Sequence, residues 1–146
     1  MKQLLILLLF VGGFITASAK GYNADQEALR SGIEENLKGK GYDIERRDDG
    51  LKFTVNGNSY YIEIDETQTD PMFVRLARYV RFDDSIKREN VMKNMSEYNS
   101  AAAVKIFCME KNVVIAADLF ITTPEQFNSA FDYLFNQLTR VAGSIK

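Results

Sequence analysis

The stretch DDGLKFTVNGNSYYIEI, residues 48–64, decides the fold of this chain. It contains two short turn signals, Asp49-Gly50 and Asn56-Gly57. A two-residue hairpin turn of type I′ needs a positive φ at both central positions, which Asn, Asp and Gly accept most readily. The two turns therefore predict a three-stranded antiparallel meander that begins near Tyr42.

The turns also predict which side chains share a face of this meander. Around the second turn Phe53 opposes Tyr60, around the first turn Arg46 opposes Phe53, and opposed residues point to the same side. One side then collects the apolar residues, which are Tyr42, Ile44, Leu51, Phe53, Val55, Tyr60, Ile62 and Ile64. The other side collects mostly charged and polar residues. We expect one face on a core and one face in water.

Three helical patterns are expected outside the meander, before a second hairpin. The first covers about 23–38, and Gly39 and Gly41 end it. A second starts at Asp70-Pro71, read as an N-cap and a first-turn proline, with an apolar stripe formed by Phe73, Leu76, Ala77 and Val80. A third covers about 88–99, with Val91, Met95 and Tyr98 on one side.

The C-terminal third predicts a hairpin followed by a helix. Residues 102–109 and 113–121 read as strands, with the turn near Lys111-Asn112. Both faces of this hairpin are apolar, so we expect cover on both faces, and a second subunit is the economical candidate. Thr123-Pro124-Glu125-Gln126 is a capping box that starts a final helix running to about residue 142.

These elements predict one α+β domain. Its order is α-βββ-αα-ββ-α, with an antiparallel five-stranded sheet made of the meander plus the hairpin. The helices are expected mainly on one face of that sheet.

The N-terminus predicts export. Residues 1–19 combine Lys2, an apolar run and Ala17-Ser18-Ala19, which is typical of a cleavable signal peptide. The alternative, a membrane anchor, needs about 20 apolar residues, and this run is shorter. We expect cleavage after Ala19, a single domain over 20–146 without stable membrane insertion, and a periplasmic or secreted protein.

The composition excludes most catalytic chemistry. The chain has no histidine and one cysteine, so neither a Cys-His nor a Ser-His nucleophile can form. Cys108 lies in an apolar strand pattern and is expected to be a buried structural residue. The carboxylates of residues 63–70 lack the loop pattern of a calcium site and read as solvated charges. We therefore expect a non-enzyme without metal or cofactor; a hydrolase using carboxylates alone has no support. With 18 basic and 20 acidic residues the chain is not basic enough for nucleic-acid binding.

Five residues are candidates for contact with a partner. Arg75, Arg78 and Arg81 recur every third residue on the expected second helix and form either a basic patch or an ordinary solvated face. Met92 and Met95 on the third helix suit an adaptable contact surface, although methionines also fill cores.

Three segments carry a family resemblance: LKFTVNGNSYYIEI (51–64), YNSAAAVKIF (98–107) and NVVIAADLFITTPEQFNSAFDYLFNQL (112–138). In these the chain resembles the YbjN-like family, which shares the fold of class I type III secretion chaperones. The resemblance implies a compact α/β sandwich, frequently dimeric, that binds polypeptides or serves in regulation. Those chaperones act in the cytoplasm, so the export signal argues against loading of secretion effectors.

Two functions follow as expectations. The first is an exported, chaperone-like binding protein that engages a polypeptide through its surface as a homodimer. The alternative is a small-ligand binder or enzyme inhibitor of the cell envelope. Its pocket would lie between the sheet and the final helix, lined by Tyr42, Phe53, Tyr60 and Phe131.

Overall fold

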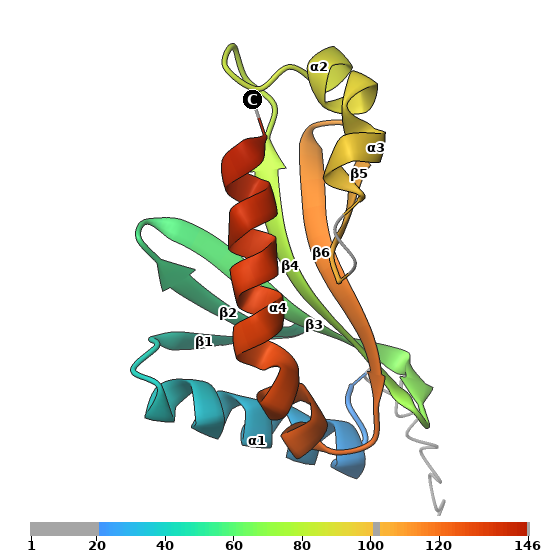
Figure 1. The fold of residues 1–146 in the computed structure, drawn as a ribbon. Helices are drawn as coiled ribbons and strands as arrows, with labels where there is room; N and C mark the ends of the chain where they lie inside the picture. The colour runs from blue at the N-terminus through green and yellow to red at the C-terminus, as the bar shows by residue number, and fades with distance from the viewer. Residues whose placement is uncertain (1–20, 101–102, 146) are drawn as a thin grey trace, which may run out of the picture.

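The computed structural model describes residues 21–100 and 103–145, so the predicted signal peptide lies outside the described residues. The elements, in chain order, are α1 (Ala24–Gly39), β1 (Ile44–Arg47), β2 (Gly50–Val55), β3 (Asn58–Thr69), β4 (Met72–Arg81), α2 (Arg88–Lys93), α3 (Met95–Tyr98), β5 (Lys105–Cys108), β6 (Asn112–Ile121) and α4 (Pro124–Ser144). The strands form one antiparallel sheet in the order β1-β2-β3-β4-β6-β5 (Figure 1). The α+β class is confirmed, but the sheet has six strands where the sequence predicted five.

The additional strand is β4, and the helix predicted there is wrong. Asp70-Pro71 forms the turn between β3 and β4 rather than the start of a helix. β4 pairs with β6 over its whole length, from Met72 opposite Ile121 to Arg81 opposite Asn112. Alternate residues of β4, among them Val74 and Leu76, are fully buried, which is the period of a strand packed on a core.

The meander forms as predicted, with one change of register. The second hairpin is confirmed: Val55 pairs with Asn58, and Asn56 and Gly57 have φ values of 50° and 77°. In the first hairpin Arg47 pairs with Gly50, so the turn residues are Asp48 and Asp49. This register differs from the prediction by two residues. A shift of two leaves each side chain on its predicted face, because side chains alternate with a period of two.

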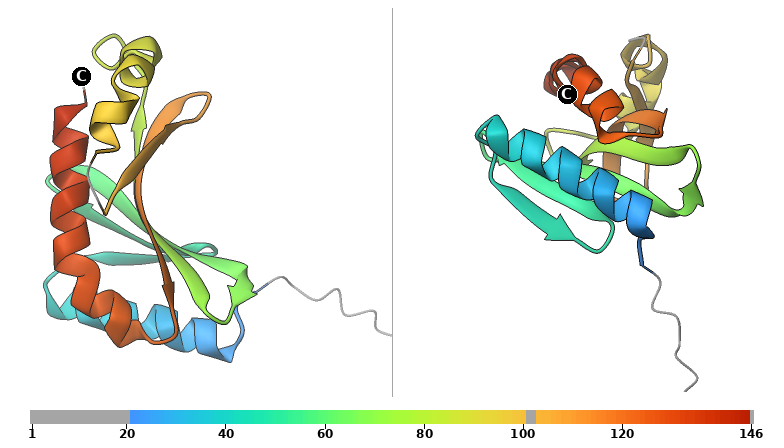
Figure 2. Two further views of the ribbon diagram at one scale, coloured as in Figure 1. Left: turned by 45° about the vertical axis from the view of Figure 1, so that its right-hand side comes forward. Right: turned by 90° about the horizontal axis from the view of Figure 1, so that it is seen from below.

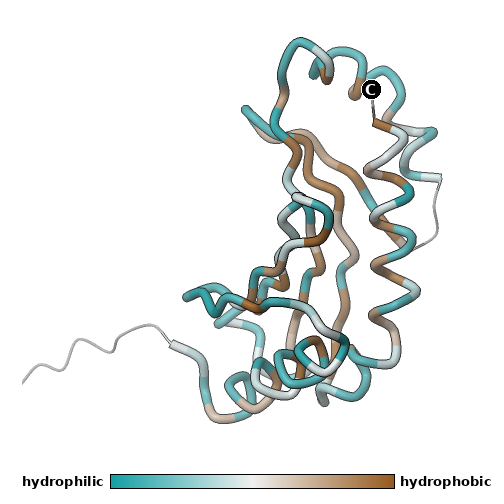
Figure 3. The backbone as a smooth tube through the Cα atoms, turned by 90° about the vertical axis from the view of Figure 1, so that its left-hand side faces the viewer, coloured by the Kyte–Doolittle hydropathy of each residue, from teal (hydrophilic) through white to brown (hydrophobic). Residues whose placement is uncertain are grey.

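Helices α1 and α4 lie across one face of the twisted sheet, and α2 and α3 lie at its far end (Figure 2). The predicted third helix is two short helices that meet at Asn94. Helix α4 begins at its capping box, where the Gln126 Oε1 accepts hydrogen bonds from the backbone N–H groups of Thr122 and Thr123. Apolar positions recur along α4 and concentrate in the central strands (Figure 3), so the core lies between this helix and the sheet.

The aromatic pocket expected between sheet and final helix is filled by its own rings. Phe53 lies 5.3 Å from Tyr42, 5.4 Å from Tyr60 and 5.9 Å from Phe131, measured between ring centroids. Phe53 and Phe131 are fully buried. This place is therefore packed core and has no room for a ligand.

Polar contacts fix α1 to the sheet. The buried Gln26 Nε2 donates to the carbonyl of Asp65 at 2.9 Å, and the hydroxyl of Tyr22 donates to the carbonyl of Ile64 at 3.1 Å. Near the other end of α1, the Glu34 carboxylate accepts from Lys38 Nζ at 2.6 Å and from Arg46 Nε at 2.5 Å. The hydrogen bond from Lys38 is the largest cause that holds the pKa of Glu34 below its ordinary value of 4.5, and the bond from Arg46 adds to it, while burial acts the other way.

This ion cluster predicts a pH-dependent contribution to stability. A carboxyl group whose pKa is lowered in the folded state stabilises the fold above its unfolded pKa, and this stabilisation is lost as the pH falls through the folded pKa. Glu34→Gln should therefore be less stable than wild type at about pH 7, and the difference should shrink at about pH 3, in urea unfolding. Glu35→Gln, which changes an exposed neighbour, serves as the control. An equal difference at both pH values would contradict the assignment.

Candidate functional site

The sheet has one face that no helix in the described part of the chain covers, here called the open face (Figure 2). It lies opposite α1 and α4. From the strand register its main side chains are Glu45, Arg47, Lys52, Thr54, Ser59, Tyr61, Glu63, Phe73, Arg75, Ala77, Tyr79, Arg81, Lys105, Phe107, Val114, Ala116, Asp118 and Phe120. The part contributed by the meander is polar, as predicted. The part contributed by β4, β5 and β6 is largely apolar.

Three phenylalanines on the apolar part of the open face, Phe73, Phe107 and Phe120, are here called the aromatic cluster; Phe73 and Phe120 are in ring contact, and Phe107 is connected to Phe73 through Arg75. Phe120 is 65% exposed and Phe107 36% exposed. The rings of Phe73 and Phe120 are 5.3 Å apart in an edge-to-face arrangement. The guanidinium of Arg75 lies 5.5 Å from the ring centroids of both Phe73 and Phe107. Exposed rings grouped in this way are typical of a contact surface.

The main charges beside the aromatic cluster are paired within the face. Arg75 donates from Nε to Asp118 Oδ1 at 2.7 Å and from Nη2 to Asp118 Oδ2 at 3.0 Å. The hydroxyl of Tyr79 donates to the Glu63 carboxylate. Burial and this hydrogen bond, in that order, raise the pKa of Tyr79 above its ordinary value of 10. A partner can therefore cover these groups without leaving them unpaired, which lowers the cost of desolvation.

The three predicted arginines do not form one patch, because they lie on strand β4, whose side chains alternate between the two faces of the sheet. Arg75 and Arg81 lie on the open face, whereas Arg78 points to the opposite side. There Arg78 Nη2 donates to Asn58 Oδ1 at 2.6 Å and its guanidinium lies 5.7 Å from the ring centroid of Tyr60. The predicted helical arrangement of the three arginines is therefore wrong, and contact of any of them with a partner stays a prediction.

The two methionines have different environments. Met92 on α2 is 49% exposed, whereas Met95 on α3 is partly buried against the main core. Met92 is thus exposed as the contact hypothesis requires and Met95 only in part, and contact of either with a partner stays a prediction. Cys108, expected to be buried, is only partly buried and packs at the margin of the same core.

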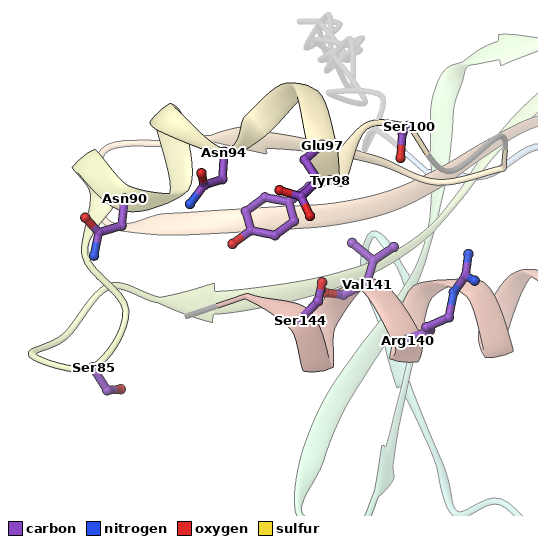
Figure 4. A pocket seen from close by; sticks show the side chains of 9 residues that line it. All are labelled: Ser85, Asn90, Asn94, Glu97, Tyr98, Ser100, Arg140, Val141 and Ser144. Atoms are coloured by element: carbon purple, nitrogen blue, oxygen red, sulfur yellow. The ribbon is translucent and has the colours of Figure 1, made fainter.

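A second feature that sequence patterns did not indicate is a polar cleft of about 730 Å³ between α2–α3 and the C-terminal half of α4 (Figure 4). Three separate segments line it: Ser85 from the loop after β4; Asn90, Asn94, Glu97, Tyr98 and Ser100 from α2, α3 and the turn that follows; and Arg140, Val141 and Ser144 from α4. Ser85 also donates to Asp83 Oδ1 at 2.7 Å. Because these segments are up to 59 positions apart in the chain, no local motif could have predicted the cleft.

Neither a metal-binding group nor a membrane-spanning helix is found in the described residues. No group of three or more His, Cys, Asp or Glu side chains is arranged to hold a metal ion within residues 21–100 and 103–145. Within the same ranges no helix has the length and apolar character to cross a membrane.

Comparison with known proteins identifies the fold. No protein-family model matches the sequence, and no curated protein matches it. Among solved structures, the chain is similar to the "crystal structure of YbjN, a putative transcription regulator from E. coli", with a TM-score of 0.56 and 17% sequence identity. The match covers 76% of this chain and 86% of that chain. The chain therefore has a YbjN-like fold, in agreement with the resemblance in its sequence.

Proposed function

Given a YbjN-like fold, we propose that this protein is an exported, non-catalytic binding protein that engages a polypeptide through the open face of its sheet. The observation that carries the proposal is the aromatic cluster, two of whose rings are exposed beside charges that are already paired. Burial of such a surface is favourable by about 25 cal/mol for each Å² of apolar area. The rings supply binding energy, and the paired charges limit the desolvation cost.

In this proposal the first polypeptide to occupy the face is a second copy of the chain. Two-fold association places the same patch of each subunit against the other, so the patch has to be self-complementary. The aromatic cluster meets this need because apolar rings pack against apolar rings, and Arg75 and Asp118 neutralise each other within one subunit. An external polypeptide with exposed apolar side chains would use the same surface, and Met92 lies outside it on α2.

We expect a dimer at high micromolar concentration, measured by size-exclusion chromatography with light scattering on protein expressed as the full chain. Replacing Phe107 and Phe120 together by serine should weaken dimerisation by at least about tenfold, since central aromatic residues dominate contact energy.

The wild-type protein expressed as the full chain should begin at Lys20 on N-terminal sequencing, if residues 1–19 are removed on export. Capture of an envelope protein by the wild type, and not by the double variant, would identify an external partner.

Tyr133→Ser is the matched control, because Tyr133 is 56% exposed on α4, away from the open face. It should dimerise as the wild type does. A wild-type monomer at high micromolar concentration would overturn the dimer. Equal weakening by the control and the double variant would place the contact elsewhere.

A further inference from the structure

We infer that the polar cleft between α2–α3 and α4 binds a small zwitterion, that is, a free amino acid or short peptide that carries both an ammonium and a carboxylate group. This site is separate from the open face and goes beyond the proposed polypeptide binding. Its volume of about 730 Å³ lies within the range of roughly 300–1,000 Å³ that small-molecule sites occupy.

The first observation is that the polar groups of the cleft have few partners in the protein. The side chains of Asn90, Asn94, Glu97 and Tyr98 make no hydrogen bond or ion pair with another side chain or backbone group of residues 21–100 and 103–145. Arg140 Nη2 donates to Gln137 Oε1 at 2.7 Å, but Arg140 has no carboxylate partner among these residues. On the open face, by contrast, Arg75 is fully engaged by Asp118.

The second observation is the placement of opposite charges on opposite walls. Glu97 comes from α3 and Arg140 from α4, and Figure 4 shows the two side chains on the two sides of the opening. A carboxylate recognises an ammonium group, and a guanidinium recognises a carboxylate through paired N–H donors. A ligand with one charge of each sign satisfies both walls, whereas a singly charged ligand leaves one wall unpaired.

Further groups that line the cleft match a peptide-like ligand. Asn90 and Asn94 each offer an amide that donates and accepts, as the ligand's own amide does. Tyr98 adds a ring and a hydroxyl, and the buried Val141 adds an apolar contact. The Val141 side chain packs in the main core, and its backbone carbonyl accepts a hydrogen bond from Ser144 Oγ at 2.7 Å.

The test is an NMR titration of the ¹⁵N-labelled protein with the dipeptide alanyl-alanine and with its N-acetylated and C-amidated forms. The free dipeptide should give saturable shifts at residues around the cleft at millimolar concentration. Blocking either terminus should weaken binding about tenfold, as expected for loss of one charge-assisted hydrogen bond.

Two variants assign each charge to its wall. Glu97→Gln should weaken binding of the free dipeptide about tenfold and leave binding of the N-acetylated form unchanged. Arg140→Gln should do the same for the C-amidated form. Glu89→Gln and Arg88→Gln, on exposed neighbours that do not line the cleft, are the charge-matched controls and should bind as wild type does.

Absence of saturable shifts at millimolar dipeptide, or equal binding of the blocked and free forms, would overturn the zwitterion site. Shifts confined to the open face would also overturn it. The double serine variant of Phe107 and Phe120 should bind the dipeptide normally, so failure of the open face and failure of the cleft are distinguished in the same set of proteins.

Discussion

Phe131→Ala should destabilise the protein by about 3–5 kcal/mol, the usual cost of removing a large aromatic side chain from a core. Phe131 is fully buried on α4 and contacts three of its aromatic neighbours at centroid distances of 5.9 Å (Phe53), 6.0 Å (Tyr42) and 5.4 Å (Phe135). The substitution removes a ring that packs between α4 and the sheet. Urea unfolding followed by circular dichroism measures the change in the free energy of unfolding.

Tyr133→Ala is the control for Phe131. It changes an aromatic residue on the same helix that is 56% exposed, so the expected change is within about 0.5 kcal/mol. If both variants lost similar stability, burial of Phe131 would not be the cause, because alanine is a better helix former than either aromatic residue. A loss of less than about 1 kcal/mol in Phe131→Ala would contradict the packed aromatic core.

Gly50→Ala should cost at least about 3 kcal/mol, through two causes that act together. Gly50 has a φ of 142°, which residues with a side chain rarely adopt. A Cβ atom there would also lie 1.9 Å from the carbonyl oxygen of Ile62 on β3, a backbone atom that cannot move without breaking strand pairing. The same unfolding measurement reports the loss.

Substitutions at two other glycines distinguish the cost of backbone strain from the cost of a steric clash. Gly57 has a φ of 77° with open space around its Cα, so Gly57→Ala carries backbone strain alone, about 1–2 kcal/mol. Gly39 also faces open space and has no positive φ, so Gly39→Ala should change stability little. Equal effects at Gly50 and Gly57 would show that the close approach to Ile62 does not matter.

The meander could be predicted from sequence because its information is local. Asn56-Gly57 specifies a turn, and the alternation of Leu51, Phe53 and Val55 specifies a buried face. The first turn was placed one residue too late, because Asp49-Gly50 looks like a hairpin signal while Gly50 is needed in the strand for its approach to Ile62. The predicted faces of the strands are still correct, because the pairing shifts by two residues and side chains alternate with a period of two.

Strand β4 was mistaken for a helix because its sequence satisfies two periods. Phe73, Leu76, Ala77 and Val80 have helical spacing, whereas Met72, Val74 and Leu76 have the spacing of a strand. The pairing strand decides between the two conformations, because β6, some 40 residues away in the chain, pairs with the whole segment. Pairing at that distance overrides local preference and cannot be read from the segment itself. The same limit applies to the open face and the cleft, since distant segments build both.

The contact between the first and last helices has a consequence for synthesis. Gly32 of α1 lies so close to Pro124 of α4 that a Cβ atom at Gly32 would be 2.7 Å from the proline ring, and Lys40 Nζ reaches Asp132 at 2.7 Å. Before the 21-residue helix α4 has been made, the apolar side of the sheet lacks the helix that covers most of it in the folded protein. The core of a nascent chain therefore cannot be completed before α4 has left the ribosome.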